Sequence, residues 1–237
     1  MAVGYNPRIV TDGLVLALDA GNTKSNVGSG TTWYDLSGNG YNASLDDGAY
    51  FSDGSVVFDG DNDGVDLGRA YFETPDAFSV VVWFKPDGTK GGAQMLVYTG
   101  GGDGFGGNDE FHVHFNDSSN SVEAFMQSSV NNLNFGTDSS SIPTDKFSQV
   151  TFTISGLSGT ASATLYLNGE SKATDTASSV GRTAYTNTLV GRPYSITFPT
   201  PPRSYDGLIQ TVLIYDKELT ASEVKQNFNA HRGRFGI

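Results

Sequence analysis

Two kinds of residue in this sequence could hold a metal ion: aspartates in short loops and a pair of histidines. Asp59, Asp61 and Asp63 alternate in a loop with glycine at its sixth position, which is how a calcium-binding loop begins. The twelfth position, where an EF-hand has a bidentate glutamate, is Ala70, and the flanking residues are strand-like. We therefore interpret this loop as a turn between two strands, with a metal site as the alternative.

The second acidic loop, Gly100–Glu110, is rich in glycine and offers oxygen donors from Asp103, Asn108 and Asp109. Hard cations such as Ca2+ bind side-chain and backbone oxygens of this kind. The loop is therefore a candidate rim for calcium or a glycan. A flexible loop without a ligand is the alternative.

His112 and His114 alternate in one apolar run, so they should share a face of a strand and could ligate a metal together. The sequence does not identify a third ligand, and two polar residues on a sheet face are the simpler interpretation. His231 follows a predicted helix, where its charge would favour the C-terminal end.

Aromatic side chains in loop-like stretches could stack on sugar rings. These residues are Trp33, Tyr34, Tyr41, Tyr185, Tyr194 and Tyr205. Tyr194 and Tyr205 lie in one long stretch, residues 192–206, and we add them to the candidate rim. For each aromatic residue, packing beneath its own loop is the alternative.

Groups that could carry out catalysis are scarce. The chain has six glutamates, and Glu123 stands alone in its predicted strand. A nucleophilic serine needs a positioned base, and no Gly-x-Ser-x-Gly elbow occurs. Because the chain has no cysteine, thiolate catalysis, disulfides and cysteine-bound zinc are excluded. We predict that the protein is not an enzyme.

The elements that must position these residues are short strands separated by turn residues. The apolar runs are Gly13–Leu18, Ser55–Phe58, Phe78–Phe84, Met95–Tyr98, Phe111–Phe115, Val122–Met126, Phe147–Ile154, Ala163–Leu167 and Leu208–Tyr215. This spacing is typical of an all-β sandwich or barrel. Two of the runs, Phe78–Phe84 and Leu208–Tyr215, are apolar at odd and even positions, so both faces should be covered. We expect two stacked sheets with these strands near their centres.

One hairpin and one helix have specific signals. Asn168-Gly169 suits a type I′ turn and predicts that strands near 163–167 and 170–175 pair. Thr220 and Glu223 form a capping box, which predicts a helix ending near Ala230. Its apolar stripe would include Val224, with Leu219 ahead of the cap.

Composition excludes several partners. The formal net charge is −12, with 14 Lys+Arg against 26 Asp+Glu and no basic cluster, so nucleic acids and anionic membranes are unsuitable partners. No apolar run approaches the roughly 20 residues of a transmembrane helix. Residues 1–10 do not read as a secretory signal. We expect an N-terminal arm (1–11), one domain (12–230) and a C-terminal tail (231–237).

An ordered series of motifs resembles the laminin-G-like, concanavalin A-like jelly roll. The motifs are Gly13–Asp19, Thr32–Gly40, Val57–Gly60, Phe78–Trp83, Leu165–Gly169, Gly207–Tyr215 and the helix at Ser222–Val224. The resemblance implies two curved antiparallel sheets in a sandwich with one short C-terminal helix. It also implies glycan or protein binding on the concave face or rim loops, often with calcium.

Two groups of proteins with this fold make the expected function more specific. Pentraxins bind calcium through an Asp–Asn pair where Gly100–Glu110 falls, but the second, acidic half of their site corresponds here to Arg192-Pro193-Tyr194. Retaining glucanases of this fold resemble one another in a Glu-x-Asp-x-x-Glu strand, which this sequence does not contain. The resemblance therefore favours binding over hydrolysis, with a divergent glycoside hydrolase as a remote alternative.

The two ends of the chain, Asp12–Asn22 and Gln226–Ile237, resemble stand-alone laminin-G-like proteins among the virion components of tailed bacteriophages. This resemblance implies a protein on the virion surface, on the capsid or the tail, that binds host-surface glycans and could form homo-oligomers there. A secreted or cell-surface carbohydrate-binding module is the alternative.

The N-terminal arm is a candidate for holding the protein on such a particle. Its apolar residues, Val3, Tyr5, Ile9 and Val10, are too few for a core of their own. An extended arm can add a strand to the exposed edge of a partner's sheet. We therefore predict docking through this arm, and the alternative is that it folds back on its own sandwich.

Overall fold

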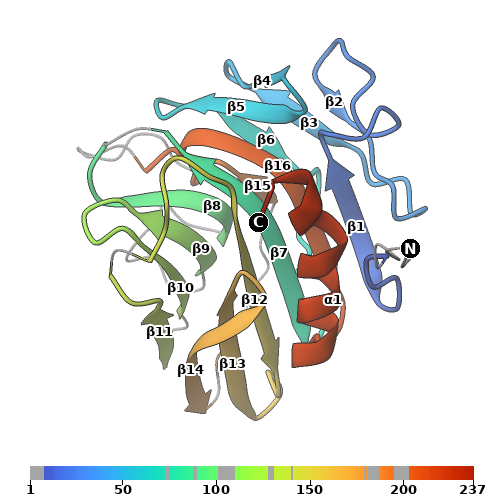
Figure 1. The fold of residues 1–237 in the computed structure, drawn as a ribbon. Helices are drawn as coiled ribbons and strands as arrows, with labels where there is room; N and C mark the ends of the chain where they lie inside the picture. The colour runs from blue at the N-terminus through green and yellow to red at the C-terminus, as the bar shows by residue number, and fades with distance from the viewer. Residues whose placement is uncertain are drawn as a thin grey trace, which may run out of the picture.

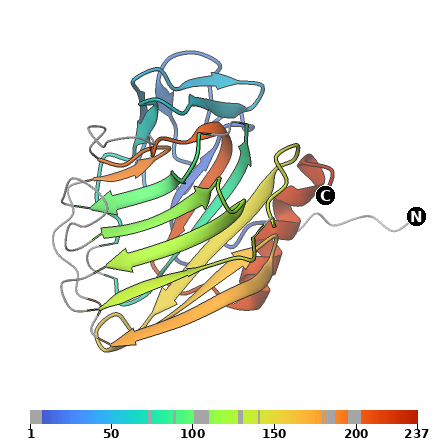
Figure 2. The ribbon, with the colours of Figure 1, turned by 90° about the vertical axis from the view of Figure 1, so that its left-hand side faces the viewer.

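The computed structural model describes residues 8–72, 75–87, 90–100, 110–127, 131–139, 141–178, 180, 187–194 and 203–237. Their strands form two antiparallel sheets that lie face to face (Figure 1, Figure 2). The predicted class, an all-β antiparallel sandwich with a short C-terminal helix, is confirmed.

Sheet A contains the two strands that the sequence predicts to be central. Its order is β14 (Glu170–Ser178), β13 (Thr160–Leu167), β12 (Ser148–Ser155), β7 (Phe78–Pro86), β16 (Asp206–Tyr215), β5 (Ser55–Asp59) and β4 (Tyr50–Ser52), with β1 (Leu14–Asp19) also paired to β16. The central pair is β7 and β16, joined over most of their length.

Sheet B carries the two histidines of interest in its β9 strand. Its order is β11 (Asn132–Gly136), β10 (Ser121–Gln127), β9 (Glu110–Asn116), β8 (Ala93–Gly100), β15 (Thr188–Val190), β6 (Gly64–Asp66), β3 (Ala43–Asp46) and β2 (Thr32–Trp33). Consecutive strands β8 to β11 are neighbours, so this half of the sheet is a meander.

Aromatic rings fill the space between the sheets. Phe78 of β7 and Phe152 of β12 face Phe111 of β9, with ring centroids 5.1 Å and 4.9 Å from it. All three side chains are fully buried. Large rings contribute most to the area buried in such a core, and edge-to-face pairs add to its stability.

The outer face of sheet A is covered by the helix α1 (Ala221–His231) and the short 3-10 helix η1 (Arg232–Arg234), as Figure 1 shows. Trp83 of β7 stacks on Phe228 of α1 at 5.7 Å and on Phe235 at 4.4 Å. This cover explains why β7 is apolar on both faces, as the sequence predicts.

The predicted turn and cap are both present. Asn168 and Gly169 have φ values of 52° and 75°, and Leu167 pairs with Glu170 across them. The Thr220 side chain accepts a hydrogen bond from the backbone of Glu223, whose side chain accepts one from the backbone of Thr220. No helix among the described residues is long and apolar enough to cross a bilayer.

Two of the first described residues, Ile9 and Val10, pack on the molecule itself. Val10 is 6% exposed; its N–H donates to Asn227 Oδ1 at 2.8 Å, and its carbonyl accepts from the Tyr215 hydroxyl at 3.0 Å. Ile9 packs against the same apolar cluster. Thus Ile9 and Val10 fold back on their own sandwich, contrary to the docking prediction. Val3 and Tyr5 lie outside the described residues, and docking through them stays a prediction.

Candidate functional site

The outer face of sheet B, on strands β8 to β11, gathers polar and aromatic side chains. Because side chains alternate along a strand, Phe111, Val113 and Phe115 enter the core and the residues between them face outward. The register then places three rows across the sheet. The rows are Glu110–Gln127–Asn132, Tyr98–His112–Phe125–Asn134, and His114–Glu123.

The middle row contains three rings. His112 lies between Tyr98 and Phe125, with ring centroids 6.3 Å and 5.0 Å away and interplanar angles of 17° and 23°. His112 is fully buried, and burial lowers its pKa well below the ordinary value. It is therefore neutral at pH 7 and supports the half-buried Phe125 ring from one side.

In the third row, neighbouring side chains hold the carboxylate of Glu123 in place. Glu123 lies 3.4 Å from His114 Nε2 and accepts hydrogen bonds from Asn116 Nδ2 at 2.7 Å and Ser121 Oγ at 3.3 Å. The hydrogen bond from His114 is the main cause that lowers the pKa of Glu123 to about 2. The carboxylate is thus charged at neutral pH and held in one orientation.

A second carboxylate on this face has the opposite character. Glu110 is 2% exposed, and neither of its carboxylate oxygens accepts a hydrogen bond within the described part of the chain. Burial raises its pKa to about 7, against the opposing effect of Arg203. The segment before β16 brings Arg203 here, because its carbonyl accepts a hydrogen bond from Met95 of β8 at 2.9 Å.

The face becomes more exposed toward β11. Asn132 and Asn134 are exposed, whereas Leu133 between them enters the core. Gln127 and Phe125 beside them on β10 are half-buried. Carboxamides both donate and accept hydrogen bonds, which suits a ligand rich in hydroxyl groups.

The two carboxylates of this face do not have the spacing of a glycosidase pair. Glu123 lies opposite His114, which is four residues along β9 from Glu110. Four residues of a strand span roughly 13 Å, whereas paired glycosidase carboxylates lie about 5–9.5 Å apart. Nor do the described residues contain a group of three histidines and carboxylates that could hold a metal ion.

The predicted rim residues differ in where the structure places them. Tyr194 is 53% exposed, as a binding residue should be. Tyr205 is fully buried between the sheets, where its ring packs 5.9 Å from Phe58 and 6.4 Å from Phe84, so it is not a rim residue. For Tyr205, packing rather than ligand contact is therefore the correct interpretation. Asp103, Asn108 and Asp109 lie outside the described residues, so a calcium or glycan rim there stays a prediction.

The acidic loop at Asp59–Gly64 is a turn between β5 and β6, as interpreted from the sequence. The Asp63 carboxylate accepts a hydrogen bond from the Asp59 backbone at 3.0 Å, and Asp59 accepts one from Asp61 at 2.9 Å. Nearby, Arg192 pairs with Asp47 at 3.3 Å and with Asp46 at 3.8 Å. A guanidinium thus offsets part of the negative charge near this turn.

The sequence analysis missed the link between His114 and Glu123. It placed both histidines on one face correctly, but treated Glu123 as solitary. The signal was the short turn, residues 117–120, between two alternating strands. A turn of that length sets the register of a hairpin and brings Glu123 opposite His114.

A model of the concanavalin A-like lectin/glucanases superfamily matches residues 59–225. The chain belongs to this superfamily. The match confirms the laminin-G-like resemblance of the sequence. A search of curated protein sequences gives no match.

Solved structures with the same superfamily fold include domain 4 of AbnA, an extracellular GH43 arabinanase of Geobacillus stearothermophilus, in complex with arabinotriose. It is 18% identical with a TM-score of 0.66, over 94% of this chain and 99% of that domain. Trypanosoma rangeli sialidase is 16% identical with a TM-score of 0.64, over 92% of this chain and 33% of the sialidase.

The binding domain of botulinum neurotoxin DC, solved with rat synaptotagmin II, is 13% identical with a TM-score of 0.65, over 93% of this chain and 52% of that one. The chain thus spans about a third of the length of the sialidase it matches. At these identities the likeness shows the superfamily fold alone.

Proposed function

We propose that this chain is a non-catalytic carbohydrate-binding module, and that it binds a neutral glycan on the outer face of sheet B, at β10 and β11. The observation that carries the proposal is the row of Phe125, supported by His112 at 5.0 Å, and Asn134 beside it in register. The apolar face of a sugar ring stacks on an aromatic ring, while carboxamides bond its hydroxyls.

Charge narrows the class of glycan. Glu123 is a fixed anion beside Phe125, and the whole chain has a net charge of −12. Acidic polysaccharides would be repelled, whereas a carboxylate accepts hydrogen bonds well from sugar hydroxyls. An arabinose oligosaccharide bound to a domain of the same fold, AbnA domain 4, supports a neutral ligand.

The experiment is a glycan array of neutral and acidic oligosaccharides, followed by calorimetric titration of the best ligand. We expect Phe125→Ala and Asn134→Ala to weaken binding at least tenfold, because a single stacking or hydrogen-bonding contact contributes about 1–2 kcal/mol. Tyr50→Ala is the matched control, since Tyr50 is 57% exposed on the outermost strand of sheet A.

Unchanged affinity in Phe125→Ala, with the fold intact by circular dichroism, would refute this site. Loss of affinity in Tyr50→Ala alone would indicate that the glycan binds on sheet A instead. Preference for acidic glycans would contradict the charge argument.

We also propose a biological setting for this module. The resemblance of Asp12–Asn22 and Gln226–Ile237 to phage virion proteins supports a module on a phage capsid or tail that faces host-surface glycans. Mass spectrometry of purified particles tests this setting. Detection of the protein in particles supports it, whereas detection only in a secreted or cell-surface fraction would favour the extracellular module.

A further inference from the structure

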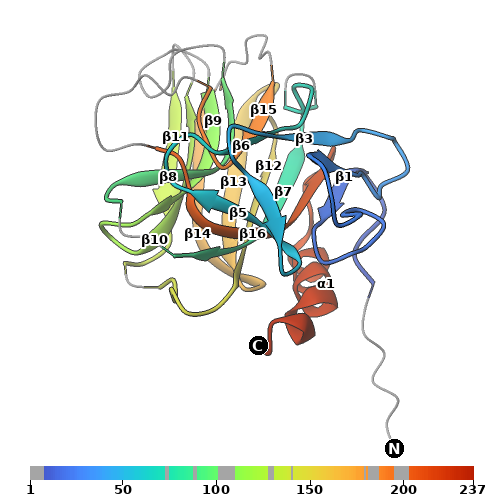
Figure 3. The same cartoon turned by 90° about the horizontal axis from the view of Figure 1, so that it is seen from above.

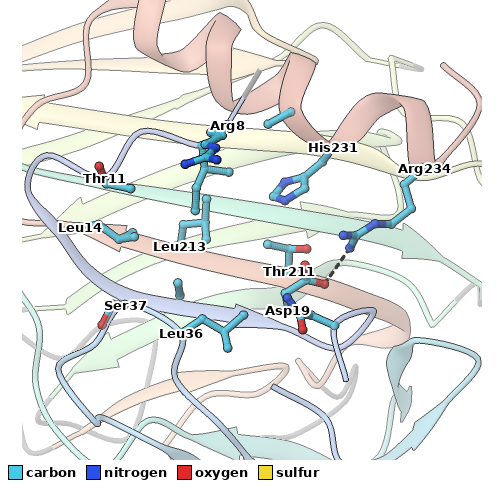
Figure 4. Close-up of a pocket in the computed structure, with 14 residues that line it drawn as sticks. Arg8, Thr11, Leu14, Asp19, Leu36, Ser37, Thr211, Leu213, His231 and Arg234 are labelled. Atoms are coloured by element: carbon cyan, nitrogen blue, oxygen red, sulfur yellow. Dashed lines mark hydrogen bonds and ion pairs between the residues drawn. The ribbon is translucent and has the colours of Figure 1, made fainter. Parts of the chain in front are cut away.

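A hollow lies on the outer face of sheet A, between β1, β16 and the end of α1 (Figure 4). Its volume is about 440 Å³, at the lower end of the range of small-molecule sites. Figure 3 shows β1 and α1 on the opposite side of the molecule from β10 and β11. The hollow, which we call the helix-end pocket, is therefore separate from the proposed glycan face.

One part of the helix-end pocket is apolar. Leu14 and Ala17 of β1, Leu213 of β16, and Ile9 and Leu36 line it. In Figure 4 Leu14 and Leu213 lie together, away from His231 and Arg234. Aliphatic side chains make up this wall, so it suits the body of an apolar ligand rather than a chain of hydroxyls.

The other part is polar and contains an ion pair, and the exposed Arg8 also lines the pocket. Asp19 Oδ1 accepts from Arg234 Nη1 at 2.7 Å, and the same nitrogen donates to Gln210 Oε1 at 3.2 Å. Because burial lowers the pKa of His231 to about 4, this histidine is neutral at pH 7. A charged ligand would have to compete with the Asp19–Arg234 pair.

Two buried polar atoms at this end have no hydrogen-bond partner in the described chain: Thr211 Oγ1 and His231 Nδ1. Thr211 is 0% exposed, and both residues line the pocket. Figure 4 shows the His231 ring and the Thr211 side chain beside each other, next to Asp19. Buried polar groups are normally hydrogen-bonded, so an orphaned pair at the bottom of a pocket indicates a ligand group.

We infer that the helix-end pocket binds a small uncharged molecule that has an aliphatic body and a hydroxyl head. The hydroxyl donates to His231 Nδ1 and accepts from Thr211 Oγ1, while the body lies against Leu14, Ala17 and Leu213. One hydroxyl satisfies both orphaned atoms because it is a donor and an acceptor. An anionic or cationic head group of the same shape cannot form both hydrogen bonds, and its burial costs desolvation free energy.

Cyclohexanol is the probe, titrated into the 15N-labelled full chain and followed by NMR. We expect millimolar affinity, as suits a ligand of few atoms, with shifts at the amides of Ala17, Thr211, Leu213 and His231. Cyclohexylamine and cyclohexanecarboxylate, which carry opposite charges on the same body, should bind at least fivefold more weakly. Shifts confined to other residues, or equal affinity for all three probes, would overturn the inference.

Variants of Thr211 separate ligand binding from a structural role. Thr211→Val should weaken cyclohexanol binding at least fivefold without lowering the melting temperature, since it removes an orphaned hydroxyl. Thr211→Ser should keep the affinity. Thr151→Val is the matched control, because Thr151 is equally buried on sheet A with an orphaned hydroxyl, outside the pocket. Wild-type affinity in Thr211→Val would contradict the inference.

Discussion

Glu110 and Glu123 extend from neighbouring strands to the same face of sheet B, yet their pKa values move in opposite directions. Glu123 accepts hydrogen bonds from three side chains, all of which favour its charged form. Glu110 is buried and has no such donors among the described residues, so its neutral form is favoured. At the scale of the residue, hydrogen-bond donors decide which carboxylate is charged, although both are acids on one face.

We predict that Glu110 makes the protein less stable as the pH rises. The pKa of Glu110 is about 7 in the folded chain, against an ordinary value of 4.5 for a glutamate side chain. The folded state therefore binds more protons between these values, and its stabilisation is present below pH 4.5 and lost as the pH rises through 7. The loss is on the order of 3 kcal/mol.

Thermal unfolding between pH 5 and pH 8 checks this prediction. Glu110→Gln, which stays neutral, should remove most of the fall in melting temperature over that range. An equal fall in the variant and the wild type would show that another group is responsible.

At the scale of the element, strands with apolar alternation could be predicted and strands defined by pairing alone could not. All nine apolar runs lie in strands, and their predicted ends differ from the observed ones by a few residues. The short strands β2, β4 and β6 have too few residues to show an alternating pattern. One of them, β6, also pairs with β15, which comes from a distant part of the chain. Tyr205 was misplaced because its surroundings are turn-like in sequence, whereas the Tyr205 ring itself packs between the sheets.

The loop between β2 and β3 is held by one carboxylate. Asp35 accepts hydrogen bonds from the backbones of Ala17, Ser37 and Tyr41 at 3.0, 2.8 and 3.1 Å, and from the Ser37 hydroxyl at 2.7 Å. It fastens the loop to β1. This bonding gives a physical reason for the Thr32–Gly40 motif, one of those in which the sequence resembles laminin-G-like domains.

We predict that Asp35→Ala lowers the free energy of unfolding by about 2–4 kcal/mol, because it leaves several backbone donors without a charged acceptor. Urea unfolding measures the change. Asp61→Ala is the control, since Asp61 is an exposed aspartate in another turn, and we expect about 0.5 kcal/mol or less. Similar losses of unfolding free energy in both variants would contradict the conclusion that Asp35 holds this loop.

At the scale of the whole molecule, the comparisons relate this chain to modules of larger proteins. It covers 99% of the arabinanase domain but 33% of the sialidase. The described residues put Glu110 and Glu123 roughly four strand positions apart, too far for joint attack on a glycosidic bond.

We predict that the purified protein releases no reducing ends from arabinan, β-glucan or galactan, and no sialic acid from sialosides. A reducing-sugar assay over long incubation, with a known hydrolase as positive control, provides the measurement. Turnover that disappears in Glu123→Gln would establish an enzyme and contradict the proposed binding role.

The position of β16 determines when the molecule can be completed during synthesis. It is the last strand to leave the ribosome, yet it lies inside sheet A, with β7 on one edge and β5 and β1 on the other. The hydrogen bond from Tyr215 to Val10 spans 205 positions. Closing so long a loop costs chain entropy before pairing compensates for it. The meander β8 to β11 can form early from adjacent segments, but a nascent chain that stops before residue 206 exposes the edges of β7 and β5, where another chain could add a strand.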